Sequence, residues 1–236
     1  MAMGLSRRGL FNAACCGAVG VALGRAGVAR AVEVKKTELS PDQALASLKQ
    51  GNERFVADPA ACFEKLGERR REIALGQAPF AAVVACSDSR VPPELLFGRS
   101  LGELFVIRDA GNTVDTVGLG SIEYAVEHLG VPLLVVLGHR RCGAVQAAIA
   151  VVKDNATFPG SIGRMVEPIV PAVLKAQGVP GHLQENAVRE NVRRTVTRLR
   201  TSAEPILMEP MRQGRLRIVG AGYDLDDGRV DWFMET

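Results

Sequence analysis

Short runs of apolar residues recur along the chain and alternate with stretches of helical periodicity. The runs cover residues 80–85, 104–107, 133–137 and 216–219. Between them, apolar residues at helical spacing predict helices over residues 116–129, 144–152, 162–176 and 182–199. Strands that alternate with helices pair in parallel. The pattern therefore predicts an α/β fold with a mostly parallel central sheet of about four strands, flanked by helices.

The ends of this region predict one more helix and one more strand. Ser40 and Pro41 form a helix start, and apolar residues follow at helical spacing as far as Phe55, which indicates an N-terminal arm helix. Near the other end, the turn signal Asp226-Asp227-Gly228 precedes residues 229–234. We expect this last segment to return as an antiparallel edge strand.

Residues 1–31 have the features of a bacterial twin-arginine signal peptide. Arg7-Arg8 precedes a mildly apolar run, and Ala29-Arg30-Ala31 offers a small-residue cleavage signal. The apolar run of about 15 residues is too short for a membrane span, which needs roughly 20. We expect a mature domain of residues 32–236, exported to the periplasm or secreted, with no stable membrane span after cleavage. An uncleaved anchor or a disordered tail is the alternative.

The charge balance argues against a nucleic-acid or membrane-surface partner. The formal net charge is +3, but four of the 29 Lys and Arg residues lie in the first 31 positions, where no acidic residue occurs. The remainder carries 25 basic residues against 26 acidic ones, and no basic stripe with interleaved aromatic residues remains. We interpret the arginines near the end of the last long helix as a solvated face. They are Arg189, Arg193, Arg194, Arg198 and Arg200.

Three cysteines remain after the leader, and two of them can meet a histidine at the carboxyl edge of the predicted sheet. The odd number argues against a disulfide framework, and we interpret Cys62 as a packing residue. Cys86 and His139 each follow an apolar run, at the edge of a parallel sheet where ligands gather. Cys142 lies three residues after His139, at the start of the next helix. Two cysteines and one histidine with an open fourth position are typical of a catalytic zinc site.

Asp88 and Arg90 flank the cysteine and can form a pair beside the metal. The planar guanidinium of arginine matches a carboxylate through two parallel hydrogen bonds. When Arg90 holds Asp88, the carboxylate can accept a hydrogen bond from the nucleophile and orient it. When Arg90 releases Asp88, the carboxylate can become a fourth metal ligand. The sequence leaves both states open.

These motifs together resemble the β-class carbonic anhydrases. Cys86-Ser87-Asp88-Ser89-Arg90-Val91-Pro92 and Gly138-His139-Arg140-Arg141-Cys142-Gly143 are similar to the two signatures of that family. Residues 102–108 and 120–126 are similar to two further family segments. The resemblance runs from about Leu39 to the C-terminus. It implies one zinc ion per subunit, held by Cys86, His139 and Cys142, with Asp88 and Arg90 as the catalytic pair.

The resemblance also implies a substrate pocket and an oligomer. Gln77 is similar to a glutamine that binds substrate, and the small CO2 pocket would be lined by Phe105, Ala110, Tyr124 and Gly143. Several of these residues come from a neighbouring subunit in the family, so a homodimer or a dimer of dimers is implied. Tyr124 and His128 share one helix face and are similar to proposed proton shuttles; an exposed histidine without a role is the alternative.

The implied activity is reversible, zinc-dependent hydration of CO2 to bicarbonate and a proton by attack of zinc-bound hydroxide. Two alternatives remain: a related hydrolase of CS2 or COS, and a zinc- or bicarbonate-binding module without catalysis. Some family members also bind regulatory bicarbonate with a tryptophan, a valine and an arginine. Val91 and Arg108 match, but Val83 occupies the tryptophan position, which argues against this switch.

Overall fold

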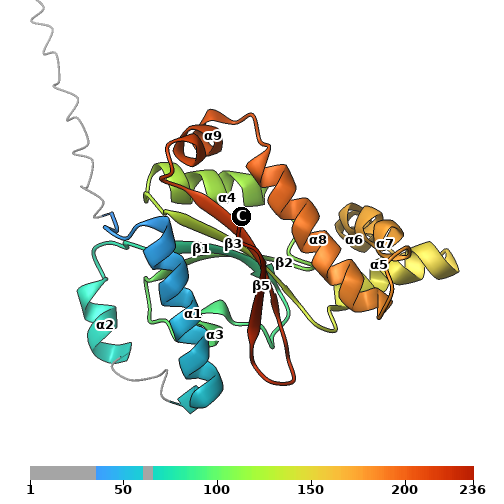
Figure 1. The fold of residues 1–236 in the computed structure, drawn as a ribbon, viewed down its shortest axis with the longest axis horizontal. Helices are drawn as coiled ribbons and strands as arrows, with labels where there is room; N and C mark the ends of the chain where they lie inside the picture. Colours follow the sequence, from blue (N-terminus) through green and yellow to red (C-terminus); the bar gives the residue numbers. More distant parts are fainter. Residues whose placement is uncertain (1–35, 61–65) are drawn as a thin grey trace, which may run out of the picture. The chain divides into compact units, whose positions relative to one another are not determined.

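A five-stranded sheet forms the centre of the fold (Figure 1). The structure is a computed structural model that describes residues 36–60 and 66–236. The predicted signal peptide and Cys62 lie outside these residues. The strands are β1 (Ala81–Cys86), β2 (Leu104–Asp109), β3 (Leu133–His139), β4 (Arg217–Tyr223) and β5 (Val230–Met234).

The sheet has the order β2-β1-β3-β4-β5, with β1 to β4 parallel. β5 returns antiparallel to β4 with an irregularity at Gly220 and Ala221. Every residue of β1 and β3 is buried, as expected for central strands covered on both faces. The predicted α/β architecture, including the antiparallel edge strand, is confirmed.

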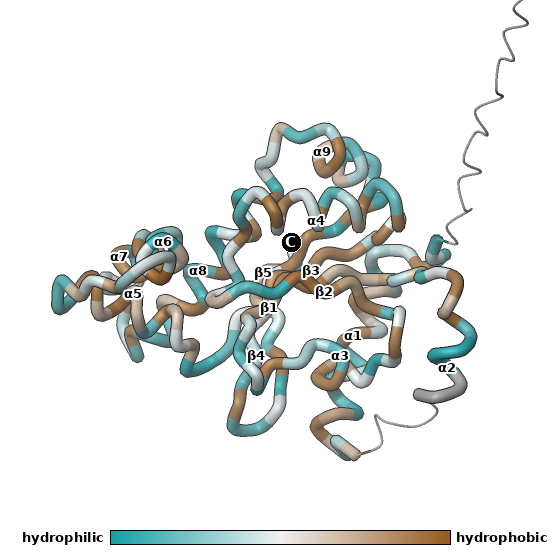
Figure 2. Tube along the Cα trace, turned by 180° about the vertical axis from the view of Figure 1, so that it is seen from behind, coloured by the Kyte–Doolittle hydropathy of each residue, from teal (hydrophilic) through white to brown (hydrophobic). Residues whose placement is uncertain are grey.

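Helices cover both faces of the sheet. Successive side chains of a strand point to opposite faces, so the strands contribute to one apolar cluster on each face. Val83, Val135 and Val219 pack toward α1 (Pro41–Ala57) and α3 (Pro93–Leu96). Val84 and Val136 pack on the other face, toward α4 (Thr116–Glu127), α8 (Leu183–Arg200) and α9 (Pro205–Arg212). Figure 2 shows hydrophobic residues concentrated along the central strands.

A third apolar cluster lies next to the carboxyl ends of the strands. It joins α5 (Gly143–Asp154), α6 (Ile162–Val166), α7 (Val170–Ala176) and the start of α8, and it includes Cys86 and Cys142. The candidate ligands are therefore attached to a packed part of the fold.

The predicted arm helix is present as α1. The Ser40 side chain accepts a hydrogen bond from the backbone N–H of Gln43, and the Gln43 side chain accepts one from the backbone of Ser40, which forms a capping box. Ala44, Leu45 and Leu48 are buried against the chain's own sheet. Figure 1 shows α1 and α3 next to each other on one side of the sheet.

Two expectations from the sequence are wrong. Residues 162–176 do not form one helix, because a 3₁₀ turn (Glu167–Ile169) containing Pro168 separates α6 from α7 and proline cannot donate a backbone hydrogen bond. The arginines of α8 are not a uniformly solvated face. Arg189 and Arg193 lie over the ring of Phe233, and Arg200 donates to the carbonyl of Ile218.

Three short helices were not predicted: α2 (Leu66–Glu72), α3 and α9. Among the described residues, no helix is both long and apolar enough to cross a membrane.

Candidate metal centre

Three metal-ligating side chains converge at the carboxyl edge of the sheet. Cys86 ends β1, His139 ends the adjacent strand β3, and Cys142 is the residue before α5. Their donor atoms all lie within 4.8 Å of one another, and the three residues are buried. The two Sγ atoms are 4.0 Å apart. The structure thus brings together the three residues that the sequence singled out.

The geometry of these donors fits a tetrahedral zinc ion. Two zinc–sulfur bonds of about 2.3 Å at a tetrahedral angle place the sulfur atoms about 3.8 Å apart, close to the observed separation. Nε2 of His139 is buried without a hydrogen-bond partner, while Nδ1 lies 2.9 Å from the carbonyl oxygen of Arg140. This contact favours the tautomer with the proton on Nδ1, which leaves the Nε2 lone pair free for a metal.

The surroundings of the two thiols favour a bound cation. The hydrogen bond from Cys142 lowers the pKa of Cys86, and the backbone N–H of Gly111, 3.3 Å from Sγ, also lowers it. The neighbouring Cys86 thiolate and burial raise the pKa of Cys142. A cation that binds both sulfur atoms would displace the protons of these two interacting thiols.

Asp88 and Arg90 form a bidentate pair at the rim of the site. Nε and Nη2 of Arg90 donate to Oδ1 and Oδ2 of Asp88 at 2.9 and 2.7 Å. These hydrogen bonds hold the pKa of Asp88 well below its usual range. Oδ2 of Asp88 lies 3.9 Å from Nε2 of His139. Of the two states left open by the sequence, the structure contains the one in which Arg90 holds an ionised Asp88.

Backbone contacts position this pair relative to the strands. Arg108, at the end of β2, donates to the carbonyl oxygens of Cys86 and Asp88 at 3.0 and 2.6 Å. The backbone N–H of Ser87 donates to the carbonyl of Asp109 at 2.9 Å. The segment after β1 is therefore fixed to the neighbouring strand.

The residues expected to bind substrate fall into two groups within one chain. Ala110 precedes Gly111, whose N–H contacts Cys86, and Gly143 follows Cys142. Gln77 instead lies before the amino end of β1, a strand whose six residues span about 20 Å. Phe105 pairs with Ala82 near that same end. One chain therefore places Gln77 and Phe105 away from its own metal ligands.

Tyr124 belongs to this distant group. Its ring centroid lies 6.1 Å from that of Phe105 and 5.0 Å from that of His128. Tyr124 and His128 do share one face of α4, as their spacing predicts.

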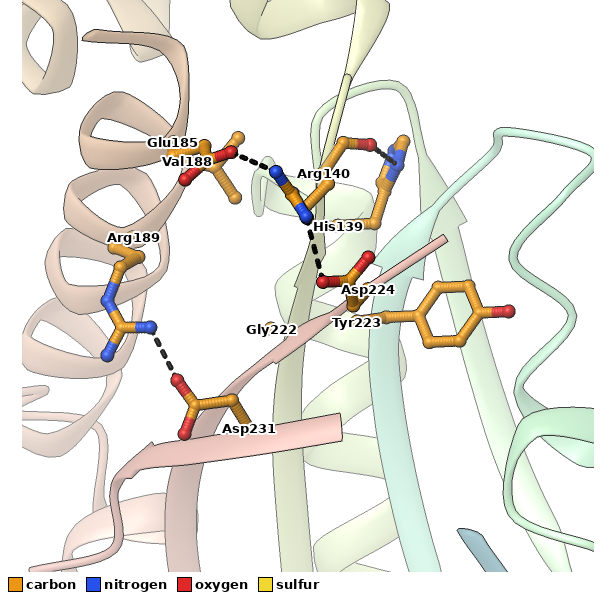
Figure 3. A pocket seen from close by; sticks show the side chains of 9 residues that line it. All are labelled: His139, Arg140, Glu185, Val188, Arg189, Gly222, Tyr223, Asp224 and Asp231. Atoms are coloured by element: carbon orange, nitrogen blue, oxygen red, sulfur yellow. Dashed lines mark hydrogen bonds and ion pairs between the residues drawn. The ribbon is translucent and has the colours of Figure 1, made fainter. Parts of the chain in front are cut away.

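Several residues around the site were not identified from the sequence. A cavity of about 240 Å³ adjoins His139 and is lined in part by Arg140, Glu185 and Asp224 (Figure 3). Nε2 of Gln184 donates to the carbonyl of Cys142 at 3.2 Å. Gln184 and Glu185 come from α8, far along the chain, and no local motif indicates that they reach the site. Arg140 and Arg141 lie between the ligands His139 and Cys142, and this position in the sequence was the one signal that could have pointed to them.

Comparisons with known proteins agree with this geometry. The family described as carbonic anhydrase matches residues 81–230. Carbonic anhydrase 2 of Mycobacterium tuberculosis (strain H37Rv) is 43% identical over 192 residues, which are 81% of this chain and 92% of that protein. A carbonic anhydrase of Pseudomonas aeruginosa is 41% identical over 172 residues, covering 68% and 76% of the two chains.

Solved structures show the same fold. The β-carbonic anhydrase CafA of Aspergillus fumigatus is 27% identical, with a TM-score of 0.63 over 83% of this chain and 91% of that one. One of two tetrameric β-carbonic anhydrases from Sordaria macrospora is 25% identical, with a TM-score of 0.62 over 71% and 90%.

Proposed function

Because this chain belongs to the β-class of the carbonic anhydrase family, we propose that it hydrates CO2 reversibly to bicarbonate and a proton, using one zinc ion per subunit. The observation that carries the proposal is the convergence of Cys86, His139 and Cys142 within 4.8 Å, with the pair of Asp88 and Arg90 at its rim. When bound, zinc would supply the Lewis acidity that makes water nucleophilic near neutral pH.

The side chains of the site would hold the ion and position the nucleophile. The thiolates of Cys86 and Cys142 balance the charge of the ion, and the carbonyl of Arg140 holds the His139 ring in its ligating orientation. Asp88 accepts a hydrogen bond from the attacking oxygen and thereby orients its lone pair toward CO2. Arg90 keeps Asp88 ionised and in place through two hydrogen bonds. Release by Arg90 would let Asp88 close the site as a fourth ligand.

We further propose that a second copy of the chain completes the substrate pocket. Phe105 and Ile107 on the sheet-edge strand β2, together with Val117 of α4, line a groove of about 370 Å³. Val117 is 77% exposed and Tyr124 is 46% exposed. An apolar sheet edge of this kind is suited to burial in an interface. A homodimer, or a dimer of dimers, would bring Gln77, Phe105 and Tyr124 of one subunit to the metal of the other.

In such an assembly, Tyr124 and His128 would face the neighbouring site. Both side chains are exposed, and their rings are in contact. They are our candidates for passing the proton from that site to solvent.

The expected signal peptide supports a proposal for where the protein is located. The paired Arg7 and Arg8 with the short apolar run after them support a signal peptide of residues 1–31 and a mature domain of residues 32–236. We propose export by a twin-arginine-type route to the periplasm or beyond.

The Asp88→Ala variant tests catalysis against simple binding. With zinc content unchanged, we expect CO2 hydration to fall by about 100-fold or more, the usual effect of removing a positioned acid–base group. Parallel assays with CS2 and COS on the unmodified protein separate the related hydrolases. Equal CO2 hydration by the variant and the unmodified protein would contradict the assigned role of Asp88.

A further inference from the structure

The two residues between the ligands His139 and Cys142 are anchored by acidic residues from distant parts of the chain. The backbone N–H of Arg140 donates to the carbonyl of Tyr223 at 3.0 Å. Its guanidinium contacts Asp224 at 3.0 Å, Asp226 at 3.2 Å and Glu185 of α8. Figure 3 shows Arg140 extending between the carboxylates of Asp224 and Glu185, beside His139. The first residue of the loop is therefore fixed by β4 and α8 together.

Arg141 shares Asp226 with Arg140, holds it through two hydrogen bonds of its own, and has an unusual backbone. Its φ angle is +53°, a left-handed conformation that costs a residue with a Cβ free energy and is rare outside glycine. Nη1 and Nη2 donate to the two carboxylate oxygens of Asp226 at 2.9 and 2.7 Å. This bidentate pair links the metal-binding loop to the turn between β4 and β5, 85 residues later.

The conformation of Arg141 affects both parts of the site. Its carbonyl oxygen accepts a hydrogen bond from Nη2 of Arg90 at 3.4 Å, and the same Nη2 holds Asp88. The next residue is the ligand Cys142. A change in the backbone at Arg141 would therefore move a metal ligand and the catalytic pair at once.

We propose that Asp226 is a positioning residue for the metal centre, acting through Arg141. Its carboxylate fixes the Arg141 side chain and so favours the left-handed backbone that sets the direction of the Cys142 thiolate and the Arg141 carbonyl. The inference rests on the proposed zinc site, but not on which substrate that site hydrates. Groups that orient metal ligands in this way typically change metal affinity by about 10- to 100-fold when they are removed.

If the ion pair of Arg141 and Asp226 only stabilised the fold, loss of Asp226 would lower the unfolding temperature of the zinc-free protein. The side chains of Arg141 and Asp226 are 49% and 56% exposed, and ion pairs this exposed contribute little to global stability. Loss of Asp226 should therefore weaken zinc binding while leaving the unfolding temperature of the zinc-free protein unchanged.

The test compares Asp226→Asn with Asp227→Asn in the zinc-loaded full chain. The control removes the same charge one residue later, where Asp227 pairs with Arg229 and does not touch the loop. Zinc transfer to an excess of a chromogenic chelator gives the release rate. We expect release about tenfold faster for Asp226→Asn and unchanged for Asp227→Asn. The absorption spectrum of the cobalt-substituted protein, which reports ligand geometry, should change only for Asp226→Asn.

Arg141→Gly supplies the decisive second variant, because glycine adopts a positive φ without an anchor. In the Arg141→Gly background, Asp226→Asn should not accelerate zinc release further. Equal release rates for the two asparagine variants would overturn the proposal, as would an undiminished effect of Asp226→Asn in the glycine background. A lower unfolding temperature of zinc-free Asp226→Asn would overturn it too. Absence of CO2 hydration would instead refute the proposed function and leave these zinc readouts intact.

Discussion

At the scale of single residues, two carboxyl groups near the site have pKa values shifted in opposite directions. Two hydrogen bonds from Arg90 lower the pKa of Asp88. Asp109, at the end of β2, is partly buried, and one of its carboxylate oxygens has no hydrogen-bond partner. Burial raises its pKa to about 6, and the nearby Asp115 adds to the increase. The contributions of the two carboxyl groups to folding stability therefore depend on pH with opposite sign.

Replacing Asp109 by asparagine should change how stability depends on pH. A carboxyl group whose pKa is higher in the folded than in the unfolded state stabilises the fold at low pH, and this contribution is lost as the pH rises from about 4 to 6. For the metal-free protein, we expect the free energy of unfolding of Asp109→Asn to equal that of the parent near pH 4. Above pH 6, we expect it to be higher than that of the parent by at most about 3 kcal/mol. Urea unfolding across this range measures the difference.

The exposed Asp227→Asn is the control for this series, since it removes a carboxylate without relieving burial. A difference between Asp109→Asn and the parent that stays constant from pH 4 to 7 would contradict the assignment of the raised pKa to Asp109.

At the scale of elements, close packing of α8 on the sheet depends on two glycines. A Cβ added to Gly138 of β3 would lie 2.7 Å from Cγ2 of Val192 and 3.0 Å from Cγ1 of Val188. A Cβ at Gly220 of β4 would lie 2.9 Å from Cγ1 of Val192. Because Gly138 directly precedes His139, the approach of α8 also affects where the histidine ligand lies.

Gly138→Ala should therefore destabilise the fold. Overpacking of a tight contact costs about 1–3 kcal/mol, and urea unfolding of the zinc-free protein measures it. Gly163→Ala in α6 is the control, because its added Cβ would meet its nearest neighbour at an ordinary 3.4 Å. Similar unfolding free energies for the two variants would contradict this expectation, because they would show that α8 can move away from Gly138 without loss of stability.

The elements that could be predicted from the sequence are those whose signal is local. β1 and β3 are buried on both faces, so they are continuous apolar runs. The α9 helix was missed because it is short and contains Pro210. The half-buried arginines of α8 were misinterpreted because their partner, Phe233 of β5, lies about 40 positions away along the chain.

In the site, too, local patterns could be predicted from the sequence and long-range contacts could not. Cys86, His139 and Cys142 could be predicted because two adjacent parallel strands end at one edge of the sheet. The link from Asp226 to Arg141 joins residues 85 positions apart, and only the folded chain brings them together.

At the scale of the whole molecule, the separation between the metal ligands and Gln77, Phe105 and Tyr124 makes the proposed pocket depend on assembly. Val117→Glu would place a charge in the proposed interface, and burying an unpaired charge is costly. We expect this variant to be monomeric and to lose at least about tenfold in CO2 hydration while it retains zinc. Analytical ultracentrifugation and zinc analysis check the two parts.

Met208→Glu on α9 is the matched control, since Met208 is also an exposed apolar residue, at 44% exposure, but lies away from the edge strand β2. A Val117→Glu monomer with full activity would show that one chain completes its own substrate pocket.

The central claim is that this chain is a zinc-dependent CO2 hydratase, and the most direct test is the pH profile of CO2 hydration by the zinc-loaded protein. Cys86 and Cys142 would hold the ion as two thiolates and reduce its effective charge, so it would acidify water less than zinc held by three histidines does. We therefore predict activity that rises toward alkaline pH and is substantial above about pH 8. Protein that holds zinc stoichiometrically but hydrates no CO2 in that range would contradict the account.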